Sequence, residues 1–402
     1  MQIGFVHFDR EDQKKYLAAI SRITEGGAID ELGVGRLRDY YSDRLFPGVS
    51  SLHQHAKYFS LMPQLYREAV MDYKYNTISE VRPTIRKLEI ELTKKLCEGS
   101  PGVKGITGSD ALREGGKYVK YDPMYIYGMA LQTYGIVKTD SLEQAIFYAS
   151  KKYHERPVKL SAKDDEQGDS EDQDSVLSFL SFPSNLEYKW KDGCSLILTP
   201  SEQDFLTRHI LEISKATKNS LLHYLLDNKI WLDKNEVPTY EIFVDWIRRN
   251  REDLPEKLLS DILRASHFSD LVDGLFYRFN WLYSGETDLK ILAKFNKWHE
   301  EVFVPGKDAM IASLEGVVIN DNNSIPFCTK AINLISRCKW GDLDYLIKRR
   351  EQSIKQSRHK IDNVEAGYIY DPNHPIHNYK LQFRWETVRL FVNEILGGTP
   401  DE

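Results

Sequence analysis

Apolar residues recur at helical spacing along most of the chain, and turn residues separate the helical stretches. The stretch from Arg10 to Ile23 is amphipathic and is followed by Gly26-Gly27, a common end for a helix. A longer stretch from Tyr66 to Cys97 contains no glycine, and its Pro83 should break or kink it. The pattern therefore predicts helices before and after a turn-rich segment.

A capped aromatic helix is predicted next. Asp122 and Pro123 are typical of the N-cap and the first position of a helix, and they open a predicted helix from Met124 to Thr133. Short alternating runs on either side, Lys117–Tyr121 and Ile136–Lys138, have the pattern of β arms. Helices followed by short β arms would suit a winged-helix unit, so we expect the N-terminal part to be winged-helix-like.

The second half of the chain has an almost purely helical pattern. Thr199 and Glu202 form a capping box at the start of one helix. A long apolar face extends from Leu258 to Phe279, with a break expected near Ser266, and a final helix is expected over about 385–396. The fold class that we predict is mostly α, with a minor β component in the N-terminal part.

Charge marks a boundary within these 402 residues. The net charge is +4 over residues 1–160, −6 over 161–176 and −4 over the remainder. The short acidic tract lacks aromatic residues and cannot bury enough apolar surface to order itself, so we interpret it as a linker. An alternative is that it mimics phosphate and shields a basic surface. We expect three parts: a motif-bearing domain over 1–160, a linker over 161–176 and a helical domain over 177–402.

No apolar run approaches the roughly 20 residues that span a bilayer. The N-terminus has no basic stretch followed by an apolar one, as a secretion signal would. The four cysteines show no CxxC spacing and are too few for a disulfide scaffold. We therefore expect a cytoplasmic protein without a membrane partner.

One turn-rich segment, ELGVGRLRDYYSDRLFPGVSSLHQHAKYFSLMP, gathers residues that bind phosphate and bases. Arg36, Arg38 and Lys57 could neutralise backbone charge, while Gln54 and Tyr58 could form hydrogen bonds or stack on bases. The structural alternative is that the arginines pin the turn and that Tyr58 lies in the core.

Two further basic stretches lie outside this segment. Arg113, Lys117 and Lys120 belong to a glycine-rich loop and a predicted β arm, which could grip a duplex backbone or be an ordinary solvated loop. The run IKRREQSIKQSRHK, residues 347–360, has six Lys or Arg and one acid. Such a run can bind nucleic acid or can be the solvated face of a helix.

The sequence resembles a bacterial family known only as a domain of unknown function. The resemblance rests on ELGVG..RD....LFPGVS..Q..AKYF...P and on three further stretches, NSLLHYLL, HFSDLVDGLFYRFNWL and LQFRWETVRLFVNEI. It implies a cytoplasmic protein from antiviral defence loci that also encode helicase and phospholipase-D-like proteins, and it supplies no catalytic residues. The family pattern has arginines where His55 and Lys57 stand, and Lys57 lacks the bidentate fork of arginine.

No catalytic, cofactor or metal signature stands out. A phosphate-binding GxxxxGK[ST] loop and a GxSxG elbow are both missing from the sequence. His374 and His377 near Asp371 lie in a proline-containing loop, so we expect no metal there. Glu89 and Glu91 have the letters of a nuclease E-x-K motif, but their helical pattern indicates surface charges.

These observations leave three hypotheses. The first is a non-enzymatic, nucleic-acid-associated subunit of a defence system, with DNA and a helicase or nuclease as partners and without a cofactor. The second is a nuclease or nucleotide-processing enzyme with a site near residues 36–58. The third is a protein–protein adaptor, which requires uncovered apolar faces after residue 200.

Overall fold

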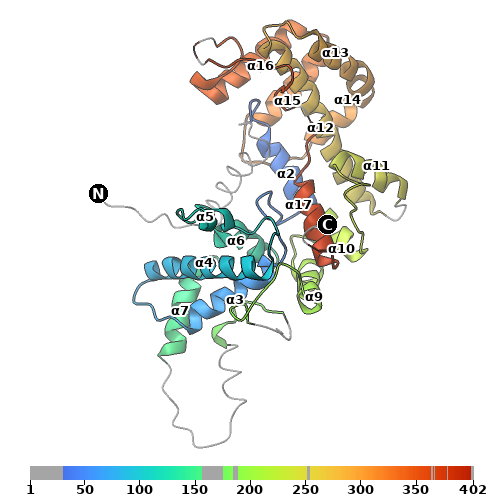
Figure 1. The fold of residues 1–402 in the computed structure, drawn as a ribbon. Helices are drawn as coiled ribbons and strands as arrows, with labels where there is room; N and C mark the ends of the chain where they lie inside the picture. The colour runs from blue at the N-terminus through green and yellow to red at the C-terminus, as the bar shows by residue number, and fades with distance from the viewer. Residues whose placement is uncertain are drawn as a thin grey trace, which may run out of the picture. The chain divides into compact units, whose positions relative to one another are not determined.

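The computed structural model describes residues 30–155, 175–183, 189–250, 254–363, 365, 367–377 and 379–399. The helix predicted at 10–23 lies outside the described residues, as does the acidic tract apart from Ser175 and Val176. The chain forms two compact units, and each is discontinuous in sequence (Figure 1). Unit 1 holds the described parts of Phe46–Lys234 and Thr387–Glu402, and unit 2 those of Ala18–Leu45 and Asn235–Glu386. This division does not coincide with the boundaries expected at 160 and 177.

The prediction of a mostly helical protein is confirmed. The helices of unit 1 are α3 (Tyr58–Met71), η1 (Ile78–Glu80), α4 (Val81–Gly99), α5 (Ser109–Arg113), α6 (Pro123–Thr133), α7 (Leu142–His154), α9 (Pro200–Arg208), η2 (His209–Ile213), α10 (Leu221–Asp227) and most of α17 (Trp385–Ile395). Those of unit 2 are α2 (Gly35–Leu45), α11 (Tyr240–Asn250), α12 (Glu256–Tyr283), α13 (Leu289–Trp298), η3 (His299–Phe303), α14 (Val304–Leu314), α15 (Ser324–Ser336), α16 (Trp340–Lys355) and η4 (Gln356–Arg358). None of these helices combines the length and the apolar character that crossing a bilayer requires.

Local start signals set several helix ends. The Asp122 side chain accepts a hydrogen bond from the amide of Tyr125 at the start of α6, and Pro123 is its first residue. Thr199 and Glu202 form the predicted capping box of α9. Each cap satisfies an amide that the helix itself leaves unpaired, which is why these starts could be predicted.

Two helix predictions need correction. The helical pattern after Tyr66 is interrupted before Pro83: α3 ends at Met71 and α4 starts at Val81, so Pro83 lies in the first turn of α4. A proline there loses no helical hydrogen bond, because amides of the first turn have no partner within the helix. The break expected near Ser266 does not occur, and α12 is continuous.

The predicted β arms are not strands, and the winged-helix expectation is not confirmed. In the ranges described above, no strand forms, and Val137 makes only an isolated antiparallel bridge with Leu180. The carbonyls of Tyr118 and Val119 accept hydrogen bonds from the Arg86 guanidinium, 3.0 and 2.8 Å away. Because a side chain takes these acceptors, they are not available for a strand ladder.

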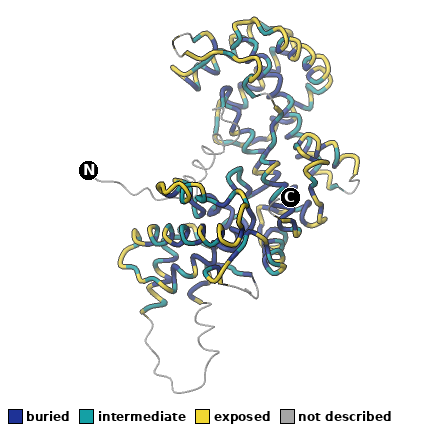
Figure 2. The backbone as a smooth tube through the Cα atoms, viewed as in Figure 1, coloured by how far each residue is buried: buried dark blue, intermediate teal, exposed yellow. Residues whose placement is uncertain are grey.

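Each unit has its own core, whose buried positions are dark blue in Figure 2. In unit 1, Tyr127 of α6 stacks on both His53 and Tyr58, with ring centroids 4.7 Å apart in each pair. Its hydroxyl also accepts hydrogen bonds from the amides of Gln54 and His55. This single tyrosine therefore fixes the segment that follows the LFPG turn.

Candidate functional site

The structure separates the eight predicted nucleic-acid-binding residues by burial and by unit. Arg36 and Arg38 belong to unit 2, and the other six belong to unit 1. The exposed ones are Arg36, Gln54, Arg113, Lys117 and Lys120; Arg38 is half-buried, and Lys57 and Tyr58 are buried.

Lys57 is part of a buried ion pair. Its ammonium lies 2.5 Å from the Glu202 carboxylate and 2.9 Å from the carbonyl of Ile197, and both side chains are 1% exposed. Burial lowers the pKa of Lys57, whereas Glu202 raises it. Burial also acts to raise the pKa of Glu202, but Lys57 outweighs it and the net shift is downward. The net shift of the Lys57 pKa is downward. The contact joins the segment after the LFPG turn to α9 and keeps Lys57 away from the surface.

His55 is anchored in a similar way. Its Nδ1 lies 2.7 Å from the Glu394 carboxylate, and its Nε2 lies 2.7 Å from the carbonyl of Lys104. Both neighbours accept hydrogen bonds, so the ring can satisfy both only when both nitrogens carry a proton. The amide of Ala56 donates to the same Glu394 carboxylate at 2.6 Å. Thus the two positions where the family pattern has arginine, His55 and Lys57, both contact carboxylates inside unit 1.

Tyr58 also has a structural position. Its ring is fully buried, and its hydroxyl accepts a hydrogen bond from the amide of Thr107, 2.9 Å away. Burial raises the pKa of Tyr58 above its usual range. The tyrosine therefore anchors the glycine-rich loop over residues 101–108.

Four exposed basic residues lie in this loop and in the segment that follows it. We define the 104–120 surface as Lys104, Arg113, Lys117 and Lys120, all exposed, together with the exposed Gln54 beside Gly105. Asp110 pairs with Arg113 on the surface. Among the described residues, no carboxylate lies within ion-pair distance of Lys104, Lys117 or Lys120. Lys120 lies over the ring of Tyr121, with 5.2 Å between its ammonium and the ring centroid.

Most basic side chains of the run 347–360 form ion pairs or hydrogen bonds within unit 2. Arg350 donates to the carbonyls of Leu32 and Gly33, and Lys355 lies 2.7 Å from the Glu31 carboxylate. Lys360 pairs with the same carboxylate, and Lys348 pairs with Asp362. Because four of its six cations contact residues of unit 2 outside the run, the run does not present the continuous positive face that its sequence indicated.

Acidic residues near the turn are also paired. Asp39 contacts Arg38 at 2.9 Å, and Asp43 contacts Arg384 at 2.7 Å. A carboxylate held by arginine is poorly placed to bind a metal or to act as a base. These pairings count against an enzyme site built on residues 36–58.

Glu89 is the clearest residue that the sequence pattern misplaced. It is fully buried, not at the surface, because it lies on the buried face of α4, and its carboxylate meets the start of α6. Its Oε1 accepts the amide of Met124 at 2.6 Å, and its Oε2 has no hydrogen-bond partner among the described residues. Burial, and then Asp122, raise the pKa of Glu89 to about 8. Asp122 itself is buried between Arg82 and Arg86, at 2.6 and 3.1 Å.

A second perturbed pair lies in unit 2. Asp273 and His377 are 4.0 Å apart, and burial raises the pKa of Asp273 to about 7. Burial, and then Arg38, lower the pKa of His377 to about 4. His374 instead pairs with Asp371 on the surface. In the part of the chain that the structure describes, no His, Cys, Asp or Glu cluster could hold a metal.

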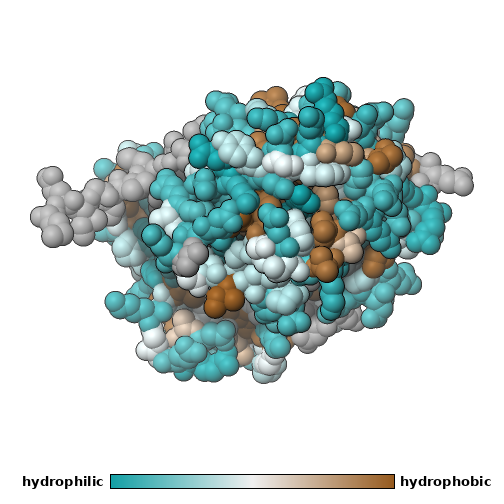
Figure 3. All heavy atoms as spheres, turned by 90° about the horizontal axis from the view of Figure 1, so that it is seen from above, coloured by the Kyte–Doolittle hydropathy of each residue, from teal (hydrophilic) through white to brown (hydrophobic). Residues whose placement is uncertain are grey.

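The longest apolar face predicted after residue 200, on α12, is packed internally. On α12, the five residues Leu258, Ile262, Leu271, Leu275 and Phe279 are buried. On the face drawn in Figure 3, hydrophobic residues form small separate groups among hydrophilic ones. The adaptor hypothesis therefore loses the uncovered face that α12 was expected to supply, whereas Leu289, Val304 and Val318 are exposed elsewhere in unit 2.

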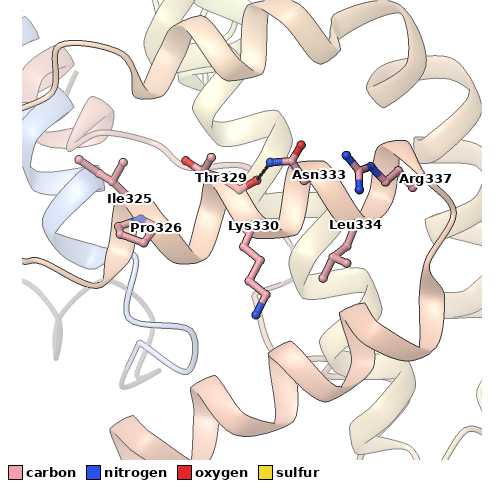
Figure 4. A pocket seen from close by; sticks show the side chains of 7 residues that line it. All are labelled: Ile325, Pro326, Thr329, Lys330, Asn333, Leu334 and Arg337. Atoms are coloured by element: carbon pink, nitrogen blue, oxygen red, sulfur yellow. Dashed lines mark hydrogen bonds between the residues drawn. The ribbon is translucent and has the colours of Figure 1, made fainter.

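Two hollows are present in unit 2. One follows a single face of α15, where Lys330 and Leu334 point to the same side and Asn333 donates to the carbonyl of Thr329 (Figure 4). The other lies beside Arg36, at the start of α2. The first is mostly apolar and open, whereas the second is lined mainly by charged and amide side chains.

Comparison with known proteins finds a family model that matches the first part of the chain. Residues 1–180 match the model of a family described as "Family of unknown function (DUF6361)". No curated protein matches the chain, and no solved structure does. The expectation of an uncharacterised family is thereby confirmed.

Proposed function

We propose that this chain is a nucleic-acid-binding protein whose contact region is the 104–120 surface of unit 1. The observation that carries the proposal is that Lys104, Lys117 and Lys120 are exposed and have no carboxylate partner among the described residues. The exposed Gln54 lies beside Gly105 of the same segment. Residues 101–121 contain four basic and two acidic side chains, so the segment is net positive in a chain that is net negative. Such a local excess attracts phosphate backbones despite the overall charge.

The chemistry of this surface favours backbone contact over sequence reading. Lysine ammonium groups neutralise phosphates as point charges and carry no base specificity. Tyr121 and Tyr125, whose ring centroids are 5.0 Å apart, lie half-buried beside Lys120. An aromatic pair next to a lysine can stack on an unpaired base, so we expect single strands to bind at least as well as duplexes.

We further propose that the protein acts as a non-enzymatic accessory subunit in a bacterial antiviral defence system. The support is the resemblance of its motifs to a family from such loci, together with the carboxylates near the LFPG turn that are occupied by arginines. In this role the chain would bind DNA in the cytoplasm while a helicase or nuclease partner acts on it. No cofactor is required for such a role.

The test is binding of a labelled 20-nucleotide single strand and the matching duplex at several salt concentrations. Three or four phosphate contacts from these lysines and Arg113 predict an affinity loss for the duplex on the order of 100-fold between 50 and 200 mM salt. The variant Lys104→Glu/Lys117→Glu/Lys120→Glu should abolish binding at 50 mM salt. A charge-matched control, Lys215→Glu/Lys218→Glu/Lys234→Glu, reverses three exposed lysines elsewhere on unit 1 and should bind within about threefold of the wild type. Equal loss in both variants, or binding that ignores salt, would refute this surface.

A further inference from the structure

The polar hollow of unit 2 has the size and lining of a small-molecule site. Its volume is about 480 Å³, within the range of ligand pockets. It lies where the ELGVG loop, the start of α2, the N-terminus of α15 and α16 meet. Its lining consists of Asp30, Gly33, Arg36, Asn320, Asp321, Asn322, Asn323, Arg350 and Ile354.

The guanidinium groups of Arg36 and Arg350 both have N–H groups that make no hydrogen bond within the described residues. Arg36 is exposed and donates one hydrogen bond to the carbonyl of Asn320. Arg350 uses its Nε and Nη2 on the carbonyls of Leu32 and Gly33 and on the Ser324 hydroxyl. A guanidinium carries five N–H bonds, so both arginines keep donors for a ligand, Arg36 most of all. Such a fork matches the oxygens of a phosphate.

Two aspartates line the hollow beside the arginines, so a simple anion such as inorganic phosphate is not the ligand that fits it best. Asp30 accepts the amide of Gly35 through Oδ2, and its Oδ1 has no hydrogen-bond partner among the described residues. Burial acts to raise the pKa of Asp321, but hydrogen bonds from Ser324 and Asn323 outweigh it, so this carboxylate is charged at neutral pH. Two arginines and two aspartates give the lining no net formal charge.

The three asparagines add both donors and acceptors. Their side chains make no hydrogen bond within the described part of the chain, although they line a polar hollow. Carboxamides and a free carboxylate oxygen suit a ligand body rich in hydroxyl or amino groups. Ile354 supplies the apolar contact that the face of a base would need.

We propose that this hollow binds a nucleoside phosphate, with the phosphate on Arg36 and the sugar hydroxyls or base amino group on Asp30 and the asparagines. Two sources offer this chemistry: a free nucleotide and the 5′-phosphorylated end of a strand. The site belongs to unit 2 and is independent of the 104–120 surface, so either proposal can fail without the other.

Calorimetric titration of the full chain with AMP, GMP, CMP, UMP and inorganic phosphate tests the proposal. At least one mononucleotide should bind saturably and at least tenfold more tightly than phosphate alone. A 5′-phosphorylated tetranucleotide, compared with its 5′-hydroxyl form, separates a strand end from a free nucleotide as the source. Binding of the phosphorylated tetranucleotide alone would assign the site to strand ends.

Variants complete the test. Arg36→Ala and Asp30→Asn should each weaken nucleotide binding at least tenfold. Arg349→Ala removes an exposed arginine of α16 outside the hollow and should change it less than twofold. Thermal unfolding of each variant establishes that it folds. No saturable binding of any probe, equal affinity for phosphate and nucleotide, or an unchanged affinity in Arg36→Ala would overturn the proposal.

Discussion

The Arg350 guanidinium lies against Gly33, and its Nη2 donates to the Gly33 carbonyl at 3.1 Å. A Cβ at Gly33 would lie 2.6 Å from that same nitrogen, and the glycine has a φ of +65°. Residues that carry a side chain rarely adopt this left-handed backbone conformation. The ELGVG loop therefore requires glycine at position 33 for two reasons: the backbone has a positive φ there, and a Cβ would clash with the Arg350 guanidinium.

Replacing Gly33 by alanine should lower the free energy of unfolding by about 2–3 kcal/mol, since a strained φ and a steric clash act together. The matched control is Gly316→Ala, because Gly316 has a φ of +66° and open space around it. The control should lose only about 1 kcal/mol. Urea denaturation of both variants gives the comparison. Equal losses would mean that Arg350 moves aside at no cost.

Removing the Lys57 ammonium should destabilise unit 1. Lys57→Met leaves the buried Glu202 carboxylate without its cation, which typically costs about 3–5 kcal/mol. Lys57→Met/Glu202→Gln should recover much of this loss, because no charge is then buried alone and the glutamine can still accept the capping hydrogen bond from Thr199. Denaturant unfolding of the two variants, with the exposed Lys94→Met as control, measures the effect. A double variant no more stable than the single one would contradict an ion-pair role.

Because the pKa of Glu89 is raised, we expect the stability of the protein to fall as the pH rises. The folded-state pKa is about 8, above the unfolded value near 4.5, so the folded protein binds a proton that the unfolded chain has released between these pH values. The contribution of this bound proton to the free energy of unfolding is complete below pH 4.5 and is lost as the pH rises through 8. Relative to Glu89→Gln, the wild type should lose a few kcal/mol of unfolding free energy between about pH 5 and pH 8.5. A constant difference between the two proteins over this range would show that Glu89 is already ionised.

Gly274 in α12 should not tolerate alanine. A Cβ there would lie 2.2 Å from the Trp298 ring, which is itself fixed by a 2.8 Å hydrogen bond to the carbonyl of Asp270. We expect Gly274→Ala to destabilise the protein by about 1–3 kcal/mol through overpacking. Gly306→Ala, in α14, meets nothing closer than 3.8 Å and should stabilise it by up to about 1 kcal/mol. Thermal unfolding that moved both variants in the same direction would contradict this.

What the sequence predicted well is local. Asp122 and Thr199 cap helices through contacts three residues away, so a short window of sequence contains both partners. Lys57 and Glu89 have partners up to 145 positions away, and nothing in their neighbourhood indicates burial. The helical spacing around Glu89 was correct, but the pattern could not tell that the carboxylate faces α6.

The candidate surface was predicted only in part for the same reason. Arg113, Lys117 and Lys120 are exposed as a solvated basic loop requires, whereas the denser run at 347–360 is largely neutralised within unit 2. The number of basic residues in a sequence segment does not show which distant carboxylates pair with them in the folded protein. Glu31 takes two of those cations from more than 300 positions away.

The discontinuity of unit 1 limits how this protein can be divided for expression. A fragment ending at residue 180, where the family match ends, would keep Lys57 and His55 but lose Glu202 and Glu394. Such a fragment would leave the buried Lys57 and His55 side chains without their carboxylate partners, so we expect it not to fold as it does in the whole chain. Family boundaries drawn from sequence similarity therefore do not mark an autonomous domain here, and a shortened protein that fails to bind DNA would say nothing about the whole chain.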